Sequence, residues 1–216
     1  MDSQIPGQTH LLAYPPDIDE LDERILNAAL TQFAQAGIHR ASTDDIARRA
    51  QINRTTLHRR FGPKKQLIRA AVTYECRRTL ARIAAQLDPR ATVAERAAHG
   101  FVLTVSTLRA HPLLRQALAV DPDNALTWLT RDGADILTIA TSFVTAQIRT
   151  ASAAITDPVA RAHHETISSI IVRLEHSLVL TPDAPPNLKT DAELWAFAHA
   201  YIAPLVNLPP GELRTN

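Results

Sequence analysis

The sequence has little of several residues that common fold classes need. Its 216 residues include one cysteine, Cys76, which excludes an intrachain disulfide framework and a cysteine-rich zinc site and indicates a reducing compartment. Only 6 glycines and 5% aromatic residues are present, too few to favour hairpin turns or a glycine-rich dinucleotide loop. No apolar run approaches the roughly 20 residues of a membrane span, and no basic residue precedes the short apolar patch near the amino terminus. We therefore expect a cytoplasmic protein that does not enter a membrane.

Alanine, leucine, isoleucine and arginine are abundant, which favours helices. Apolar residues recur at three- and four-residue spacing from Asp22 onward, and no segment alternates strictly between apolar and polar residues. We predict an all-α protein of about nine helices, with an arm at 1–21, a three-helix domain at 22–70 and a second helical domain at 71–216.

The ends of the predicted helices are given by capping residues, glycine and proline. A first helix runs from Asp22 to a glycine stop at Gly37, Thr43 caps a short second helix, and Asn53 caps a third at 54–61. Gly62 and Pro63 end the third helix, and a long fourth helix runs to about position 87. Six further positions begin the remaining helices: Thr92, Pro112, Asp123, Asp132, Pro158 and Asp191.

Positive charge is concentrated in the predicted three-helix domain. Residues 22–70 contain ten basic and four acidic side chains, whereas residues 1–21 contain four acidic and no basic ones. Such a segment is expected where a protein meets a polyanion, but an arginine-rich solvated surface explains the charge alone equally well. The arrangement of the helices has to decide between these interpretations.

Two short helices joined by a tight turn, the second one basic, are what a helix-turn-helix requires. Leu57 and Phe61 lie four residues apart and are expected to point inward, while the start and outer face of the second helix meet the DNA. Thr43 starts the second predicted helix and Lys64 starts the fourth, and both are placed to bind phosphates. The predicted groove-facing side chains are Arg54, Thr55, Thr56, His58 and Arg59.

These residues also resemble a known family. The stretches ILNAALTQFAQAG at 25–37, STDDIARRA at 42–50 and INRTTLHRRFGPKKQL at 52–67 together resemble the amino-terminal domain of the TetR family of bacterial repressors. The resemblance covers roughly 45 residues, and linked motifs at fixed spacing are more specific than an isolated helix-turn-helix. It implies phosphate contacts at Thr43 and Lys64 and base or backbone contacts from Asn53 to Arg59. His58 stands where the family usually has tyrosine, so the charge of this contact depends on pH.

The resemblance further implies a homodimer, an operator in double-stranded DNA with two half-sites, and a carboxy-terminal domain that binds an inducer. Helices at 157–180 and 191–207 are expected to form the dimer, with plain core packing as the alternative. More apolar positions are available than one narrow stripe needs, so one face can serve the core and another an interface. These positions are Ile167, Ile170, Ile171, Leu174 and Leu178.

A ligand pocket is expected among the middle helices, although taken singly each aromatic residue fits plain core packing better and each charged residue fits the surface or an interface better. The apolar candidates are Phe101, Val105, Leu108, Trp128, Leu129, Ile136 and Phe143, and the polar candidates are Arg173, Glu175 and His176. Residues 111–128 and 173–177 resemble regulators of lactone-signal degradation in actinobacteria, which is compatible with a lactone or acyl inducer.

No enzymatic or metal-binding motif is present. Cys76 has no predicted histidine partner, and His163, His164 and Glu165 are consecutive and cannot share one helical face. We expect no enzyme activity, no cofactor and no metal. The favoured hypothesis is a dimeric, ligand-responsive transcriptional repressor. A constitutive DNA-binding protein without an inducer, and an all-helical enzyme or scaffold with an incidental basic segment, remain as alternatives.

Overall fold

The computed structural model describes residues 18–151 and 158–208, and no strand is present within these ranges. The helices are α2 (Glu20–Ala36), α3 (Thr43–Arg49), α4 (Arg54–Phe61), α5 (Lys64–Ala84), α6 (Val93–Ala110), α7 (Pro112–Val120), α8 (Pro122–Leu129), α9 (Ala134–Ala151), α10 (Pro158–Leu180), α11 (Asp191–Phe197) and α12 (Ala203–Leu205). A π-helical turn, Ala198–Ile202, joins α11 to α12. When α11, this turn and α12 are counted as one helix, the described residues form ten helices rather than about nine, and the all-α prediction is confirmed. The first 17 residues of the predicted arm lie outside the described residues.

The described residues form two compact units. The amino-terminal unit contains residues 18–79 and 109–136, and the carboxy-terminal unit contains residues 80–108, 137–151 and 158–208. Helices α5, α6 and α9 therefore contribute residues to both units.

Helix α2 begins two residues before the predicted start because an earlier acidic side chain caps it. Asp19 Oδ1 accepts a hydrogen bond from the N–H of Asp22 at 2.9 Å. The predicted stop at Gly37 is confirmed: at φ +84° its N–H reaches the Phe33 carbonyl at 3.0 Å. Its ψ of 154° is outside the left-handed helical region, and a Cβ here would lie 2.8 Å from the Cβ of Asp121. Glycine is required at this position for both reasons.

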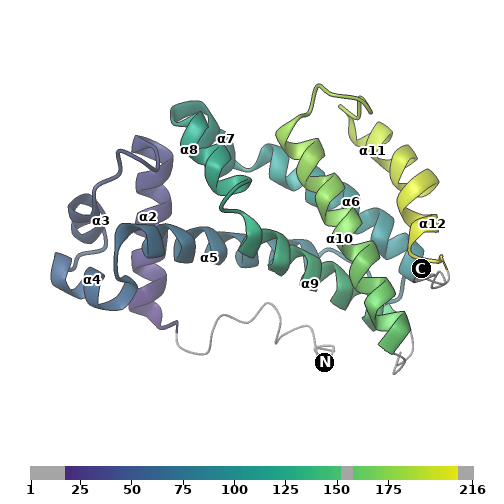
Figure 1. The fold of residues 1–216 in the computed structure, drawn as a ribbon, viewed down its shortest axis with the longest axis horizontal. Helices are drawn as coiled ribbons and strands as arrows, with labels where there is room; N and C mark the ends of the chain where they lie inside the picture. The colour runs from purple at the N-terminus through teal and green to yellow at the C-terminus, as the bar shows by residue number, and fades with distance from the viewer. Residues whose placement is uncertain (1–17, 152–157, 209–216) are drawn as a thin grey trace, which may run out of the picture. The chain divides into compact units, whose positions relative to one another are not determined.

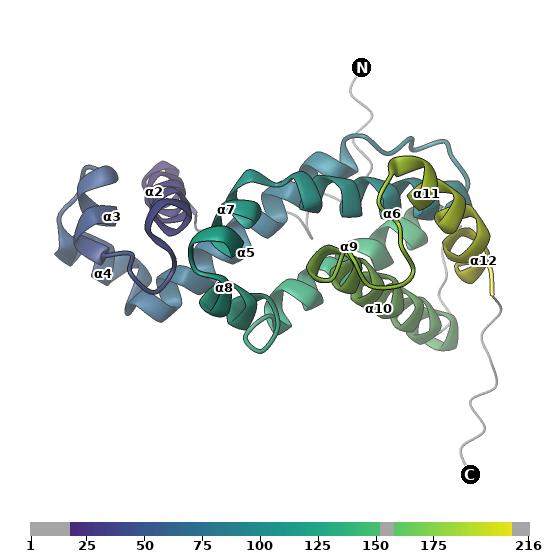
Figure 2. The ribbon, with the colours of Figure 1, turned by 90° about the horizontal axis from the view of Figure 1, so that it is seen from above.

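The core of the amino-terminal unit joins its first helices to α7 and α8. Ile25 and Leu26 of α2, Ile46 of α3, Leu57 of α4 and Leu67 of α5 are all essentially inaccessible to solvent. Leu113 and Trp128 are half-buried against this cluster. Figure 1 and Figure 2 both show α7 lying beside α2, and α8 packs against α7. The helix-turn-helix is thus held by α2 from one side and by the start of α5 from another.

The core of the carboxy-terminal unit is built from α6, α9, α10 and the last helix. Phe101 of α6, Ile148 of α9, Ile171 of α10 and Leu194 of α11 lie in one buried cluster. Phe101 also stacks on Phe197, with ring centroids 5.8 Å apart. Within this unit, α9 and α10 run close together in both views (Figure 1, Figure 2). None of the helices in the described ranges is long and apolar enough to cross a membrane.

Several predicted helix boundaries are confirmed and others are corrected. The starts after Thr92, at Pro112 and at Pro158 are confirmed, and Thr92 and Glu95 bond reciprocally through side chain and backbone. Two predicted starts, Asp123 and Asp132, are wrong. Helix α8 begins earlier, at a proline that needs no free N–H, and α9 begins two residues after Asp132. The fourth predicted helix ends at Ala84, three residues short of the expected position.

Candidate nucleic-acid interface and ligand cavity

The second helix of the helix-turn-helix, α4, is fixed at its start and on its inner face. Asn53 Oδ1 accepts a hydrogen bond from the N–H of Thr56 at 2.7 Å, which confirms Asn53 as the predicted cap. Leu57 is 1% exposed, and Phe61 is half-buried against the same core. One face of α4 is therefore packed against the core, and the other side chains of this short helix point outward.

The cap of α3 differs from the prediction. Ser42, not Thr43, precedes the helix, and its Oγ accepts a hydrogen bond from the N–H of Asp44 at 3.1 Å. Thr43 is the first helical residue, with a half-buried side chain. Serine and threonine cap helices by the same chemistry, so the sequence alone does not choose between these neighbours.

The turn between α3 and α4 is closed by backbone hydrogen bonds and by an arginine of α2. The N–H of Ile52 reaches the Ala47 carbonyl at 3.0 Å, and Gln51 takes a positive φ of 56°. Arg24 Nε donates to the Ala50 carbonyl at 3.0 Å. Arg24 therefore stabilises the turn, although in the sequence it is only one of the ten basic residues of 22–70.

The outer face of α4 is exposed and carries most of the residues predicted to contact DNA. Asn53, Arg54, Thr55, His58 and Arg59 are exposed, and Thr56 is half-buried. The structure thus brings these six residues together on one short helix and its cap. Arg54 makes an ion pair with Asp44 at 3.5 Å, with both side chains more than half exposed. Ion pairs this exposed contribute little to stability, so Arg54 can exchange Asp44 for another hydrogen-bond acceptor.

Arg60 is part of the same basic run but forms ion pairs within the protein. It donates to Asp19 Oδ2 at 2.7 Å and to Asp22 Oδ1 at 2.8 Å, and so ties α4 to the start of α2. The N–H of Asp22, and next the Arg60 guanidinium, lower the pKa of the Asp19 carboxyl group. The run Arg59-Arg60 therefore divides into one arginine that faces solvent and one that joins two helices.

Lys64, predicted to bind a phosphate, also has a partner in the protein. Its Nζ donates to the His39 carbonyl at 2.6 Å, which joins the start of α5 to the loop between α2 and α3. Partial burial lowers the pKa of Lys64, and the nearby Asp121 carboxylate opposes this shift. The phosphate contact stays a prediction.

Asp121 was missed by the sequence reasoning. Its carboxylate accepts from the backbone N–H of His39 at 3.0 Å and from the side-chain amide of Asn124 at 2.9 Å. These two bonds, the amide first, lower the pKa of Asp121. The turn between α7 and α8 is thereby bonded to the loop that precedes α3, and no local sequence signal indicates this contact between distant residues.

Comparison with known families decides what this domain is. Residues 25–71 match the family of bacterial regulatory proteins described as the tetR family. The chain carries a TetR-family DNA-binding domain. The match places the exposed face of α4 inside a domain of regulatory proteins and supports the prediction that the chain is not an enzyme. A comparison of the whole sequence with curated proteins finds no significant match.

Solved structures extend the likeness in fold beyond the TetR-family domain. The TetR-family repressor AlkX from Dietzia sp. strain DQ12-45-1b is similar with a TM-score of 0.64 at 20% identity, over 85% of this chain and 96% of that one. A TetR-family regulator from Streptomyces coelicolor A3 has a TM-score of 0.56 at 15% identity, over 87% and 95%. The fatty acid degradation regulator FadR from Bacillus halodurans has a TM-score of 0.51 at 19% identity, over 91% and 98%. The chain therefore has the fold of these regulators.

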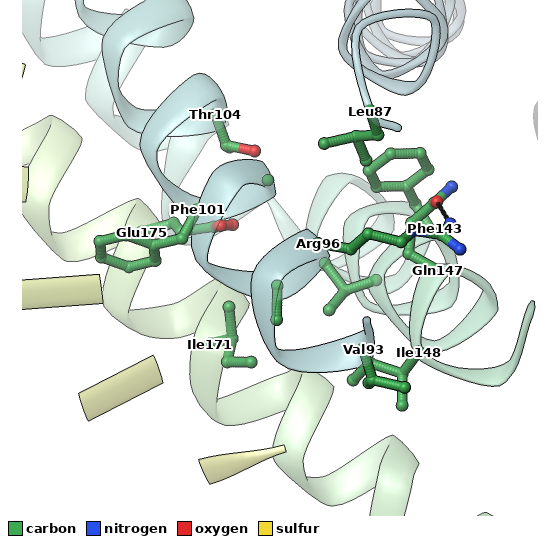
Figure 3. Close-up of a pocket in the computed structure, with 13 residues that line it drawn as sticks. Leu87, Val93, Arg96, Phe101, Thr104, Phe143, Gln147, Ile148, Ile171 and Glu175 are labelled. Atoms are coloured by element: carbon green, nitrogen blue, oxygen red, sulfur yellow. Dashed lines mark hydrogen bonds between the residues drawn. The ribbon is translucent and has the colours of Figure 1, made fainter. Parts of the chain in front are cut away.

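The carboxy-terminal unit contains a small cavity of about 30 Å³, which has room for about two water molecules. It lies among α6, α9 and α10, with Leu87 also in its lining, and Figure 3 draws its 13 lining residues and labels ten of them. Most are apolar, such as Phe101, Phe143 and Ile171. Arg96 and Gln147 join across the cavity lining by a hydrogen bond to the Gln147 amide oxygen.

The residues predicted for the ligand pocket are distributed over both units. Phe101, Phe143 and Glu175 line this cavity, whereas the other candidates do not. Val105 is buried in the carboxy-terminal core and Trp128 packs in the amino-terminal unit. The remaining candidates outside the cavity are Leu108, Leu129, Ile136, Arg173 and His176, of which Arg173 is exposed. Helical periodicity alone does not reveal which face of each helix turns toward a cavity.

Besides Arg96 and Gln147, two polar side chains line this cavity, Glu175 and Thr104. Glu175 is 5% exposed and Thr104 is 7% exposed. No hydrogen bond or ion pair joins either side chain to another described residue. Burial raises the pKa of Glu175 well above its usual range, because a carboxylate here would lose its hydration without gaining a partner.

No group of three or more metal-binding side chains occurs in the part of the chain that the structure describes. Burial raises the pKa of Cys76 to about 12, so its thiol is inert near neutral pH.

Proposed function

We propose that the chain is a homodimeric transcriptional repressor that binds an operator through α4 and is released by a small-molecule inducer. The observation that carries this proposal is the division of α4 into a buried face, held by Leu57, and an exposed polar and basic face. Residues 22–70 form the DNA-binding domain in this proposal, and residues 71–216 bind the ligand and form the dimer.

The exposed face of α4 provides two kinds of DNA contact. The guanidinium of Arg54, at the first position of the helix, pairs with a guanine edge in the major groove, and the methyl groups of Thr55 and Thr56 contact thymine methyl groups. His58 and Arg59, further along α4, contact the sugar-phosphate backbone together with Asn53. Thr43 and Lys64 bind flanking phosphates, and Lys64 keeps its bond to the His39 carbonyl while doing so.

A homodimer is proposed because one short helix reads too few bases for specific binding. Helix α10 buries Ile167 and Ile171 in the core while Ile170, between them, is 49% exposed. On the last helix, Tyr201 is 64% exposed. Exposed large apolar side chains on both elements support a subunit interface at this surface. Two-fold symmetry then places two α4 helices about 34–36 Å apart, one helical turn of DNA.

The inducer is proposed to bind in the cavity of the carboxy-terminal unit. Since the cavity has room for about two water molecules, a larger occupant has to move the helices that line it. Helix α5 contributes residues to both units, so its displacement can change the separation of the two α4 helices. A lactone or acyl compound is the proposed chemical class.

Selection of bound duplexes from a randomised DNA pool tests the proposal. We expect enrichment of a palindrome whose half-sites are centred about 10 base pairs apart. Arg59→Ala should weaken binding to the enriched duplex with little loss of thermal stability, whereas the neighbouring Arg60→Ala should lower thermal stability because it breaks the bonds to Asp19 and Asp22. Arg90→Ala, at an exposed site in the other unit, is the control. Failure to enrich any sequence would overturn the proposal.

A further inference from the structure

The cavity of the carboxy-terminal unit contains two polar side chains that the folded protein leaves unsatisfied. Glu175 projects from α10 and Thr104 from α6, and both are more than nine-tenths buried. Neither forms a hydrogen bond with another described residue, and their oxygens are not among the fully enclosed unpaired atoms, so these oxygens face the cavity. Leaving a buried polar group without a partner is costly, so two such groups on one small cavity point to an occupant that supplies the partners.

The surrounding side chains limit what this occupant can be. The lining is mainly apolar, with Phe101, Phe143, Ile148 and Ile171 among its members, which requires an apolar body. Its polar members are rich in hydrogen-bond donors, because Arg96 and Thr104 both carry them. Burial raises the pKa of Glu175 and so favours its protonated form, which adds a further O–H donor. A set of donors selects an acceptor on the ligand.

The charge of the cavity argues against ionic ligands. A cation would share a small apolar space with the Arg96 guanidinium and would require Glu175 to ionise against its desolvation cost. An anion would lose its own hydration on entering the same lining. An uncharged ligand avoids both costs.

We propose that the cavity binds an uncharged apolar molecule through a carbonyl oxygen, which accepts a hydrogen bond from the Glu175 carboxyl group, with the Thr104 hydroxyl as second polar contact. This inference rests on the ligand response proposed above and assigns the ligand class and the residues that select it. Ketones, esters and lactones share the required chemistry. Glu175 is the specificity-determining residue, because it is the donor that a ligand has to satisfy.

Calorimetric titration of the full chain with three eight-carbon probes tests this assignment. The probes are 2-octanone, octylamine and octanoate, which differ in head-group charge. We expect 2-octanone to bind at least tenfold more tightly than either ion. Glu175→Gln should keep its affinity for 2-octanone within about threefold, because the amide can still donate. Glu175→Leu and Thr104→Val, which remove the donors, should each weaken it about three- to tenfold.

A buried threonine outside the cavity provides the matched control. Thr145 on α9 is 7% exposed, like Thr104, but its hydroxyl already donates to the Thr141 carbonyl at 2.8 Å. Thr145→Val should leave 2-octanone binding unchanged, and circular dichroism should show that all variants are folded. Tighter binding of octylamine, lost in Glu175→Gln, would overturn the proposal in favour of a cationic ligand. Absence of 2-octanone binding, or equal binding by all variants, would overturn it as well.

These titrations contain no DNA, so their failure is separate from failure of the proposed function. A chain that binds 2-octanone as described but selects no DNA sequence would overturn the operator-binding proposal and keep the ligand assignment. A chain that selects a palindrome but binds none of the probes would do the reverse.

Discussion

Replacing Arg54 by alanine should weaken binding to the selected operator far more than binding to unrelated DNA. Arg54 lies at the first position of α4, from which a side chain reaches deepest into the major groove. A bidentate contact with guanine, as proposed for Arg54, discriminates against other bases, whereas contacts with phosphates do not. The loss should therefore fall mainly on the cognate sequence.

The magnitude follows from the contacts that Arg54 makes in the free protein. Loss of a bidentate guanine contact costs about 1–3 kcal/mol, or about 5- to 160-fold in affinity. The ion pair with Asp44 offsets little of this, because its atoms are 3.5 Å apart and Arg54 is 69% exposed. For the same reason Arg54→Ala should change the free energy of unfolding by no more than about 0.5 kcal/mol.

Fluorescence anisotropy with labelled duplexes, over a range of salt concentrations, measures these effects. On scrambled DNA the variant should lose at most about 0.9 in the slope of log affinity against log salt, the value for one phosphate contact. Arg90→Ala should behave as the wild type on both duplexes. Equal losses for Arg54→Ala on operator and scrambled DNA would refute base recognition by this side chain.

Three further changes test other parts of the structure. Leu57→Ala should lower the free energy of unfolding by about 2–5 kcal/mol, measured by urea denaturation, because Leu57 is 1% exposed; a loss below 1 kcal/mol would show that α4 is not anchored there. Glu175→Gln should raise stability near neutral pH. Since the folded pKa of Glu175 exceeds the unfolded value of about 4.3, the wild type loses about 1.4 kcal/mol per pH unit from that value up to its folded pKa, so thermal unfolding of both proteins should converge below pH 4. Ile170→Glu should produce monomers in sedimentation velocity, whereas Ser177→Glu, also exposed on α10, should sediment as the wild type does.

Much of the amino-terminal unit could be predicted from the sequence because its signals are local. Asn53 caps α4 through Thr56, three residues later, and Gly37 bonds to Phe33, four residues earlier, so a spacing pattern contains the information. The choice of Ser42 over Thr43 as a cap could not be predicted, since two adjacent hydroxyl residues satisfy the same rule. The different roles of Arg59 and Arg60 depend on where α2 lies in space.

Contacts between distant residues account for what the sequence left open. Asp121 bonds to His39, 82 positions earlier, and no pattern of spacing connects them. The cavity depends in the same way on which faces of α6, α9 and α10 meet. Glu175 lines it, while Arg173, two residues earlier on the same helix, faces solvent. Two positions apart on a helix point to different sides, and only the packing shows which side is the interior.

The mass of the complex formed on a duplex with one selected operator tests the central claim most directly. Native mass spectrometry should show two chains of 23.7 kDa on each duplex, and both should be lost together on the scrambled sequence. A complex containing a single chain at full affinity would contradict recognition by paired α4 helices.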